Sequence, residues 1–341
     1  MKKPVMDLSI IIVNYKSAQL VLDCIESINK ETASISFEII VVDNGSNDNS
    51  KEIITGKYPA VIWIDMGYNS GFARANNAGM EISRGNYILL LNSDTIILDR
   101  AIEKSLALLQ RHPEAAGCGV QLLNTDGSTQ ISGAHVIKGG LNTLLQLPYL
   151  GALIRYLGYR FKSTIPSVQT ITETIEVDWV VGAFIMIKKE VLTKSGLFDN
   201  DFFMYSEEME WCGRLRKHGK LLLFAEPKVI HIQGGTSSNF YDNSDSANGK
   251  NLWDSKGRQI IVSNMLRIRK QFGIGWFLFN VGFHVLEIPV FFICLLFDMI
   301  FTSGDAKYTW NNLVNYIKNI TNMLRYFIKI LFNVAYFYKV N

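Results

Sequence analysis

The residue best suited to hold a metal ion is an aspartate at the end of an apolar run. Tyr87 to Leu91 has strand length, and Asn92, Ser93 and Asp94 follow it directly. A carboxylate in this position lies where open α/β sheets place their ligands, and its oxygens suit a divalent cation that binds phosphates. Asn, Ser and Asp are also common turn residues, so a plain turn at the strand end is the alternative interpretation.

A second apolar run ends in the same way. Phe37 to Asp43 is followed by Asn44, Gly45 and Ser46. The Asp43 carboxylate is suited to accept hydrogen bonds from a pyrimidine N–H or a ribose hydroxyl. The competing interpretation is a strand-to-helix turn in which Asn-Gly supplies the bend.

The segment from Asn69 to Gly79 combines small residues with a single arginine, Arg74. Small residues permit close approach of a backbone, and a guanidinium forks onto the oxygens of a diphosphate. The segment also reads as a small-residue helix packed tightly on a sheet, with Arg74 in water. Both interpretations can hold together.

Three carboxylates lie within four residues after Tyr205-Ser206: Glu207, Glu208 and Glu210. Acidic residues at a helix N-terminus are stabilised by the helix dipole, which is one explanation. The other is that one of them is a general base that takes a proton from an acceptor hydroxyl. Neighbouring carboxylates and aromatic surroundings raise the pKa of a carboxyl toward the useful range.

A histidine, His231, closes the apolar run that begins at Leu221. A lone histidine after a strand is often structural. With a distant aspartate available, its neutral imidazole is also a candidate ligand for the same metal ion.

Alternating strands and helices must position these groups. We predict strands at Leu8–Tyr15, Phe37–Asp43, Val61–Met66 and Tyr87–Asp94, with helices after Ser17 (its N-cap), over Ser70–Ser83 and over Arg100–Arg111. This alternation predicts an α/β fold with a mostly parallel sheet and helices on both faces. Parallel strands deliver their polar ends to one edge, here Asn14-Tyr15, Asp43-Asn44, Gly67-Tyr68-Asn69 and Asn92-Ser93-Asp94.

The second half is less regular. We predict a strand over Val177–Ile187 that is interrupted at Gly182-Ala183, a helix from Ser206 to about His218, and one or two strands over Leu221–Ile232. Gly182 is a place where a backbone can approach a ligand closely. The polar stretch Thr236–Gly257 is long for a loop in a compact domain, which is typical of a functional lid or of disorder.

Composition narrows the class of protein. The chain has 341 residues and a net charge of +3, too small to indicate nucleic acid as a partner. Its four cysteines are scattered without a CxxC pair, so we expect free thiols in a reducing compartment. The short polar N-terminus does not predict a signal peptide. No dinucleotide-binding glycine pattern follows the first strand, and no Walker A loop is present.

From Gly273 onward the chain changes character. Trp276–Phe297 is almost wholly apolar and long enough to span a bilayer. Glu287 near its centre would cost on the order of 2–3 kcal/mol on insertion, and Pro289 would bend a helix. An interfacial hairpin is therefore as plausible as a clean span. Residues 320–335 place apolar side chains on one helical face and basic or amide ones on the other, typical either of a membrane-surface helix or of one packed on its own domain.

Taken in order, these motifs resemble glycosyltransferase family 2, the inverting GT-A class, in the bacterial branch that includes rhamnosyltransferases. The matching pieces run from Ile10–Tyr15, Val41–Ser46, Asn69–Gly79 and Leu91–Asp94 to Gly182-Ala183, Gly196–Asp199, Phe203–Glu210 and His231. The resemblance covers roughly residues 8–265 and implies a GT-A type, Rossmann-like fold.

The resemblance also implies a role for each matching residue. Donor contacts are expected at Asn14, Asp43, Asn69, Arg74, Asn77, Asn92 and Asp94. Asp94 matches the last acidic position of the family's Asp-x-Asp metal motif, whereas Asn92 departs from its first. Mg2+ or Mn2+ is expected on Asp94 and His231. Glu208 is the expected catalytic base, and Glu207 remains a competitor.

The implied reaction is a single in-line displacement with inversion. The expected donor is dTDP-L-rhamnose, or alternatively a UDP-sugar, and the expected acceptor is a lipid-linked saccharide or another oligosaccharide in surface polysaccharide synthesis. We expect a donor-binding half at 1–120, an acceptor-binding and catalytic half at 121–265, and a helical membrane-associating region at 266–341. Residues 273–340 would then meet the cytoplasmic face of the bacterial inner membrane, and a homo-oligomer is possible.

Two rival functions remain. The missing carboxylate at Asn92 is compatible with an inactive relative that acts as a binding or scaffolding subunit. A nucleotidyltransferase shares the doubly wound plan, but it needs a glycine-rich basic loop after the first strand, and Asn14-Tyr15-Lys16-Ser17 is not one.

Overall fold

The computed structural model describes residues 6–160, 166–232, 251–301, 307–335 and 338–340. Most of the stretch predicted as a lid, Thr236–Gly257, lies outside them. The chain forms two compact units. The sheet unit comprises residues 1–135, 167–203 and 207–240, and the helical unit comprises 136–166, 204–206 and 241–341.

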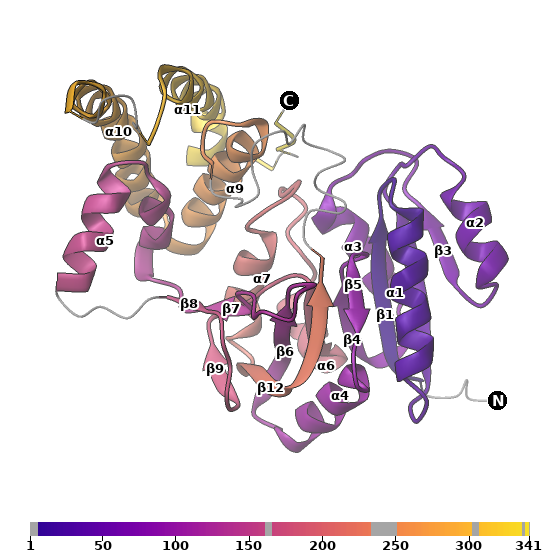
Figure 1. The fold of residues 1–341 in the computed structure, drawn as a ribbon. Coiled ribbons are helices and arrows are strands. Elements are labelled where there is room, and N and C mark those ends of the chain that lie inside the picture. Colours follow the sequence, from indigo (N-terminus) through magenta and orange to yellow (C-terminus); the bar gives the residue numbers. More distant parts are fainter. Residues whose placement is uncertain (1–5, 161–165, 233–250, 302–306, 336–337, 341) are drawn as a thin grey trace. The chain divides into compact units, whose positions relative to one another are not determined.

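The sheet unit is built on a nine-stranded sheet in the order β3-β2-β1-β4-β11-β6-β12-β5, with β9 also paired to β12. The strands are β1 (Met6–Asn14), β2 (Phe37–Asp43), β3 (Ile62–Asp65), β4 (Gly85–Leu91), β5 (Thr95–Ile97), β6 (Ala115–Leu123), β9 (Ile175–Val177), β11 (Phe184–Lys188) and β12 (Lys220–His231). A small antiparallel sheet joins β7 (Gly133–Ala134), β8 (Ser167–Val168) and β10 (Trp179–Val180). The predicted α/β class is confirmed (Figure 1).

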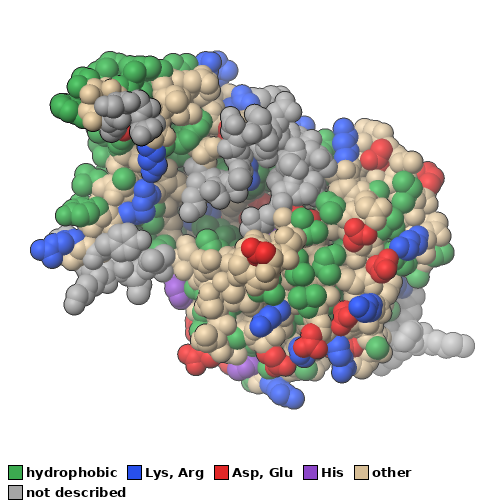
Figure 2. Space-filling model, in the orientation of Figure 1, with side chains coloured by type: hydrophobic (Ala, Val, Ile, Leu, Met, Phe, Trp, Pro, Cys, Tyr) green, Lys and Arg blue, Asp and Glu red, His purple; other side chains and the backbone are tan. Residues whose placement is uncertain are grey.

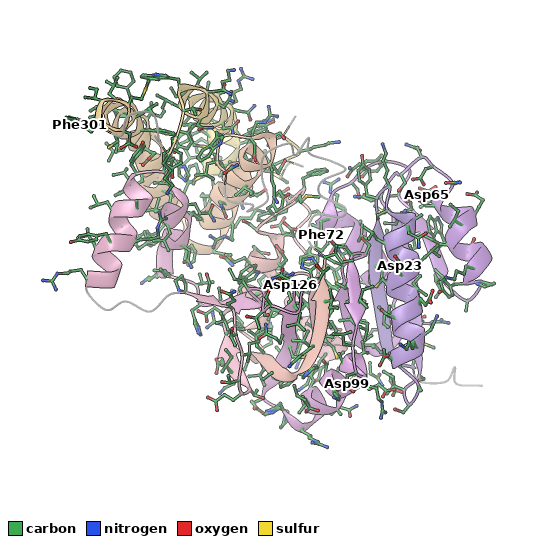
Figure 3. All side chains as sticks on the ribbon, viewed as in Figure 1. Asp23, Asp65, Phe72, Asp99, Asp126 and Phe301 are labelled. Carbon is green, nitrogen blue, oxygen red and sulfur yellow. The ribbon has the colours of Figure 1, made fainter. Side chains whose placement is uncertain are left out.

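The first four strands of the sheet order run parallel and in register. Asn14 at the end of β1 lies opposite Asp43 at the end of β2, and Asp43 lies opposite Asp65 at the end of β3. On the other side of β1, Ile12 pairs with Leu91, so Asn92 follows at the same edge. Figure 3 shows Asp65 at this end of the sheet and Asp99 at the opposite end. The predicted convergence of polar strand ends is confirmed.

Alternate side chains of the strands pack against helices on opposite faces. The helices of the sheet unit are α1 (Ala18–Glu31), α2 (Ser50–Lys57), α3 (Phe72–Ile82), α4 (Ala101–Arg111), α6 (Lys189–Ser195) and α7 (Glu207–Leu215). Leu8, Ile10 and Ile12 of β1 share a buried cluster with residues of α1 and α4. Gly79 of α3 contacts Ile11 on the other face, because a Cβ there would come within 2.6 Å of the Ile11 side chain.

Two expectations about local structure change in detail. Ser17 does occupy the N-cap position of α1, but its side chain makes no cap bond. Its hydroxyl instead donates to Asn14 Oδ1 at 3.1 Å. The stretch Leu221–Ile232 is one strand, β12, whose register against β6 shifts between Phe224 and Lys228 around Pro227.

Two turns at the strand ends are fixed to each other. Asn44 donates to Asn69 Oδ1 at 3.1 Å, and its own Oδ1 accepts from the backbone and the hydroxyl of Ser70, both at 2.8 Å. Gly45 has φ +77°, and a Cβ on it would lie 2.5 Å from the carbonyl carbon of Tyr68. Only glycine satisfies both the backbone conformation and this approach.

The helical unit contains η1 (Lys138–Gln146), α5 (Leu150–Arg160), α9 (Ser255–Phe272), α10 (Ile274–Phe301) and α11 (Trp310–Leu331). Within the described residues, α10 is the one helix long and apolar enough to cross a membrane. It is a single helix of 28 residues that continues through Pro289, rather than a hairpin.

The distribution of polar and apolar side chains on α10 is the reverse of that on a surface helix of a water-soluble protein. Its buried residues include Asn280, His284 and Glu287, whereas each of its exposed residues is apolar or glycine, as in Leu286 at 49% exposure. Figure 2 shows hydrophobic side chains gathered over α10.

The buried polar groups of α10 have partners within the helical unit. Glu287 accepts the backbone N–H groups of Tyr149 and Leu150, at 2.8 and 3.0 Å, at the start of α5. Asn280 donates to the carbonyl of Gly139 at 2.9 Å. The carboxylate that the sequence marked as an obstacle to insertion is thus turned inward and hydrogen-bonded.

The prediction of which apolar residues of α11 face outward is partly wrong. Ile320 and Met323 are buried inside the helical unit. The exposed apolar residues of α11 and its C-terminal end are Trp310, Val314, Ile317, Leu324, Ile328 and Phe332. Sequence periodicity cannot separate two adjacent apolar stripes, because both have helical spacing.

Gly45→Ala is expected to lower the free energy of unfolding by about 2 kcal/mol more than Gly67→Ala. Both glycines have positive φ (+77° and +70°), so the backbone strain of an alanine is similar, but nothing lies within 4 Å of a Cβ at Gly67. Denaturant unfolding of the two variants measures the difference. Equal destabilisation would show that the two turns can separate without cost.

Candidate active site at the parallel strand ends

Asp43 is held by a tight network at the ends of β1 and β2. Its Oδ1 accepts from Asn14 Nδ2 at 2.7 Å and from the Ser46 hydroxyl at 2.5 Å, and its Oδ2 accepts from the Ser46 backbone at 3.0 Å. Asn14 is fully buried and also donates to the Ser46 hydroxyl, at 3.1 Å. In this structure Asn14 orients Asp43, and direct donor contacts by either residue stay predictions.

The turn that contains Asn69 approaches the loop before the acidic helix. Asn69 accepts from the backbone of Gly71 at 3.1 Å, in addition to its bond from Asn44. A Cβ on Gly71 would lie 2.2 Å from the carbonyl oxygen of Phe203, which accepts from the Phe72 backbone at 2.7 Å. Phe203 is thereby anchored to the strand-end turns.

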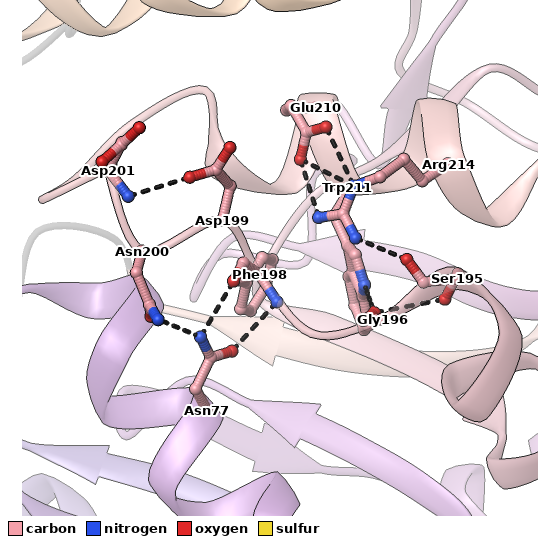
Figure 4. Close-up of polar contacts among 10 residues, drawn as sticks. All are labelled: Asn77, Ser195, Gly196, Phe198, Asp199, Asn200, Asp201, Glu210, Trp211 and Arg214. Atoms are coloured by element: carbon pink, nitrogen blue, oxygen red, sulfur yellow. Dashed lines mark hydrogen bonds and ion pairs between the residues drawn. The ribbon is translucent and has the colours of Figure 1, made fainter. Parts of the chain in front are cut away.

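Asn77 and Arg74 of α3 face the loop at residues 198–200. The Asn77 amide donates to the carbonyl of Phe198 and to Asn200 Oδ1, both at 2.9 Å, and accepts from the Phe198 backbone at 2.9 Å (Figure 4). Arg74 Nε donates to the Asn200 carbonyl at 3.1 Å. Both residues hold this loop in place, and their predicted contacts with the donor remain untested.

Antiparallel pairing of β5 with β12 brings His231 to the predicted metal aspartate. His231 lies opposite Thr95, the residue after Asp94. His231 Nε2 is 3.4 Å from Asp94 Oδ1 and 3.3 Å from Asn92 Nδ2. The two predicted metal ligands, Asp94 and His231, and the predicted donor contact Asn92 are therefore neighbours.

Asp94 and His231 form a donor set that fits a divalent ion. Two adjacent ligands of an octahedral ion at about 2.1 Å are about 3 Å apart, close to the 3.4 Å between His231 Nε2 and Asp94 Oδ1. Across the part of the chain that the structure describes, no group of three or more His, Cys, Asp or Glu is arranged to hold a metal. An ion bound by Asp94 and His231 would take its further ligands from a bound molecule or from water.

The three acidic residues of α7 occupy different environments. Glu210 forms an ion pair with Arg214 at 2.8 Å, and Arg214 also donates to the Ser195 carbonyl at 2.6 Å (Figure 4). Glu207 is 2% exposed. Glu208 is only partly buried. Of the two candidates for the base, Glu208 is thus the more exposed.

Glu208 lies against the loop that carries Gly182. A Cβ on Gly182 would be 2.9 Å from Glu208 Oε1, so the absence of a side chain at 182 makes room for the carboxylate. The next residue, Ala183, accepts the backbone N–H of Asn92 at 3.1 Å. One short loop therefore links Glu208 to the strand end that bears Asp94.

Although the Glu208 residue is partly exposed, its carboxyl packs against the loop at Gly182, and this desolvation raises its pKa above the ordinary value of 4.5. Desolvation penalises the charged form, so a carboxylate here is a stronger base than one in water. A group of this kind can accept a proton from an alcohol that becomes a nucleophile.

The sequence does not indicate which groups hydrogen-bond to the turn between β4 and β5. The Thr95 hydroxyl donates to the Asn92 carbonyl at 2.8 Å, and Ser27 of α1 accepts from the Ile97 backbone at 3.0 Å. The Gln130 side chain contacts both the backbone carbonyl and the ring of His231. These contacts join distant parts of the chain, and no local pattern signals them.

Comparison with known proteins identifies the family of the chain. The profile described as Glycosyl transferase family 2 matches residues 9–194, more than half of the chain. The protein belongs to this family.

Two curated relatives are similar to the chain. An N-acetylglucosaminyl-diphospho-decaprenol L-rhamnosyltransferase of Mycobacterium tuberculosis is 25% identical over 208 residues, 57% of this chain and 66% of that protein. A low-salt glycan biosynthesis hexosyltransferase of Haloferax volcanii is 27% identical over 217 residues, 62% of each chain. The chain thus matches slightly less than two thirds of the length of these relatives.

Among solved structures, GalNAc-T7 with UDP, GalNAc and Mn2+ has a TM-score of 0.50 and 16% identity, covering 69% of this chain and 48% of that one. At this identity the likeness concerns the fold, and it agrees with the GT-A type predicted from the motifs.

Binding of Mn2+ is expected to depend on a nucleoside diphosphate. Because the protein supplies few ligands, Mn2+ should bind at least about tenfold more tightly with dTDP or UDP present, whose phosphate oxygens complete the shell. Electron paramagnetic resonance titration of free Mn2+ measures this. Asp94→Ala should abolish the gain, whereas Asp65→Ala, at the exposed end of β3, should keep it. Retention of the gain in Asp94→Ala would remove Asp94 from the ion site.

Proposed function

We propose that this protein is an inverting glycosyltransferase that moves a sugar from a nucleoside diphosphate donor to a hydroxyl of a lipid-linked saccharide. The observation that carries this proposal is the position of Glu208. A carboxylate with a raised pKa lies against Gly182, and the next residue in that loop is hydrogen-bonded to the strand end with Asp94 and His231. A base and a diphosphate-binding group in adjacent positions are what sugar transfer to an alcohol requires.

The donor occupies the edge where the parallel strands end. Asp43, oriented by Asn14, accepts from the base or ribose, and Asn69 lines the neighbouring turn. Arg74 and Asn92 contact the sugar diphosphate, and Asn77 holds the loop at 198–200 beside Arg74. The best assignment of the donor is dTDP-L-rhamnose, supported by the rhamnosyltransferase relative, and the alternative is a UDP-sugar.

Glu208 removes the proton from the acceptor hydroxyl as that oxygen attacks the anomeric carbon. The bond to the diphosphate breaks on the opposite side, so the anomeric configuration inverts. Asp94 and His231 would hold Mg2+ or Mn2+, and the bound ion would neutralise charge on the departing diphosphate.

The acceptor is placed at a membrane by the helical unit. Exposed apolar residues on α5, α10 and α11, such as Tyr156, Ile300 and Ile328, are unsuited to water and suited to lipid. Residues 273–340 thus bind the cytoplasmic face of the bacterial inner membrane, where a lipid-linked acceptor resides. This proposal keeps the division into a donor half (1–120), an acceptor half (121–265) and a membrane region (266–341), and allows a homo-oligomer.

Glu208→Gln is expected to lower transfer by about 100-fold or more, because the amide cannot accept the proton. Donor binding should stay within about twofold, since the base acts on the acceptor. Release of nucleoside diphosphate is measured with dTDP-rhamnose, UDP-hexoses, UDP-galactofuranose and GDP-mannose, with an N-acetylglucosaminyl-diphospho-polyprenol as acceptor. Isothermal titration measures donor binding.

Glu207→Gln is the matched control and should retain most of the activity if it folds. Full activity in Glu208→Gln would eliminate the assigned base. An inactive wild type across all donors and both metals would favour the scaffolding role instead.

Leu286→Glu is expected to weaken binding to phosphatidylglycerol–phosphatidylethanolamine vesicles at least about tenfold, because it places a charge on the exposed face of α10. Ile53→Glu is the control, since Ile53 is an apolar residue of the sheet unit with 39% exposure, against 49% for Leu286. Vesicle co-sedimentation measures both. If both variants bound as the wild type does, α10 would not be the membrane surface.

A further inference from the structure

Gln130 holds His231 at two points. Its Nε2 donates to the His231 carbonyl at 2.5 Å, and its Oε1 lies 3.2 Å from His231 Nδ1. Gln130 is 4% exposed, so water does not compete freely for these bonds.

The orientation of the Gln130 amide is determined by its surroundings. Besides the His231 carbonyl, Nε2 donates to Asn124 Oδ1 at 2.8 Å and to the Leu123 carbonyl at 3.2 Å. Three oxygen acceptors surround this atom, so an amide oxygen in its place would face three repulsive contacts. The oxygen of the amide must therefore be the atom that faces His231 Nδ1.

The backbone of Gln130 is also fixed. Its N–H donates to the Leu122 carbonyl at 2.9 Å, and its carbonyl accepts from the Ser132 hydroxyl at 3.1 Å. The accepting oxygen thus has a defined position relative to the ring.

An amide oxygen can only accept, so Nδ1 of a neutral His231 must carry the hydrogen. The lone pair is then on Nε2, the nitrogen 3.4 Å from Asp94 Oδ1. Asn92 places its amide nitrogen 3.3 Å from the same atom and can donate to this lone pair, a bond that a cation on Nε2 would replace. A carboxylate at position 92 has no hydrogen to donate, so Asn92, which departs from the family motif, fits this arrangement.

We propose that Gln130 is a positioning residue that fixes His231 as the Nδ1–H tautomer and thereby presents Nε2, beside Asp94, to a divalent cation. This inference deepens the proposed function and rests on it only in assigning the ion to Asp94 and His231. Groups that hydrogen-bond the second nitrogen of a metal-binding histidine fix both its tautomer and its orientation.

The first test needs no metal and no activity. In protein labelled with 15N-histidine, long-range proton–nitrogen correlation at pH 8 is expected to show His231 with a protonated Nδ1 and an unprotonated Nε2. The His231 signals are identified by their loss in His231→Asn. A wild-type protein with hydrogen on Nε2 would overturn the proposal without any variant of Gln130.

The second test asks whether Gln130 is the cause. Gln130→Met keeps the length of the side chain but cannot accept from Nδ1, so the tautomers should mix and Mn2+ affinity in the presence of dTDP should fall about 10- to 100-fold. Gln169→Met is the control, since Gln169 is exposed and donates to the Thr129 carbonyl.

The outcomes separate this proposal from the proposed function. An unchanged tautomer and unchanged Mn2+ affinity in Gln130→Met would refute the role of Gln130 even if the wild type transfers sugar. The expected tautomer and affinity changes in a protein that transfers no sugar would support the role of Gln130 while contradicting the transferase proposal.

Discussion

The register of the parallel strands is the constraint on which the candidate site depends. Asn14 opposite Asp43, and Ile12 opposite Leu91, place three strand ends at one edge. The turns that follow these strand ends pack closely against each other, because the backbones of Gly45 and Tyr68 meet without a side chain between them. A slip of one residue in any of these strands would turn its buried side chains to the opposite face, so the core that fixes the register also fixes the site.

Much of this architecture could be predicted from the sequence because its signals are local. Apolar runs followed by Asp43 and by Asp94 identify both the strands and the edge where they end. The hydrogen-bond partners of each polar side chain could not be predicted in the same way. Asn77 looks like a ligand group in the motif, yet its amide is hydrogen-bonded to the loop at 198–200. The contact of Gln130 with His231 spans 101 residues, and no periodic pattern reports such a pair.

The helical unit illustrates the same limit. Length and apolar content identify α10, but a sequence shows Glu287 only as a charge in a lipid-like segment. Its partners, the backbone N–H groups of Tyr149 and Leu150, belong to a part of the chain 138 and 137 residues earlier. Almost every residue has a backbone N–H group, so the sequence does not indicate which of them bonds to Glu287. The inward orientation of this carboxylate is seen only in the folded structure. The outward face that remains is the one suited to lipid.

The pairing of β5 with β12 has a consequence for the order of folding. Asn92 and His231 are separated by 139 residues, and His231 is the last residue of β12. During synthesis the strands with Asn14, Asp43 and Asp94 emerge well before this histidine, at about 5–20 residues per second. A nascent chain can therefore complete the parallel strand ends while His231 is still missing. Closing a loop of this length is entropically costly, so the pairing of His231 with Asp94 is expected to form after the parallel strand ends have assembled.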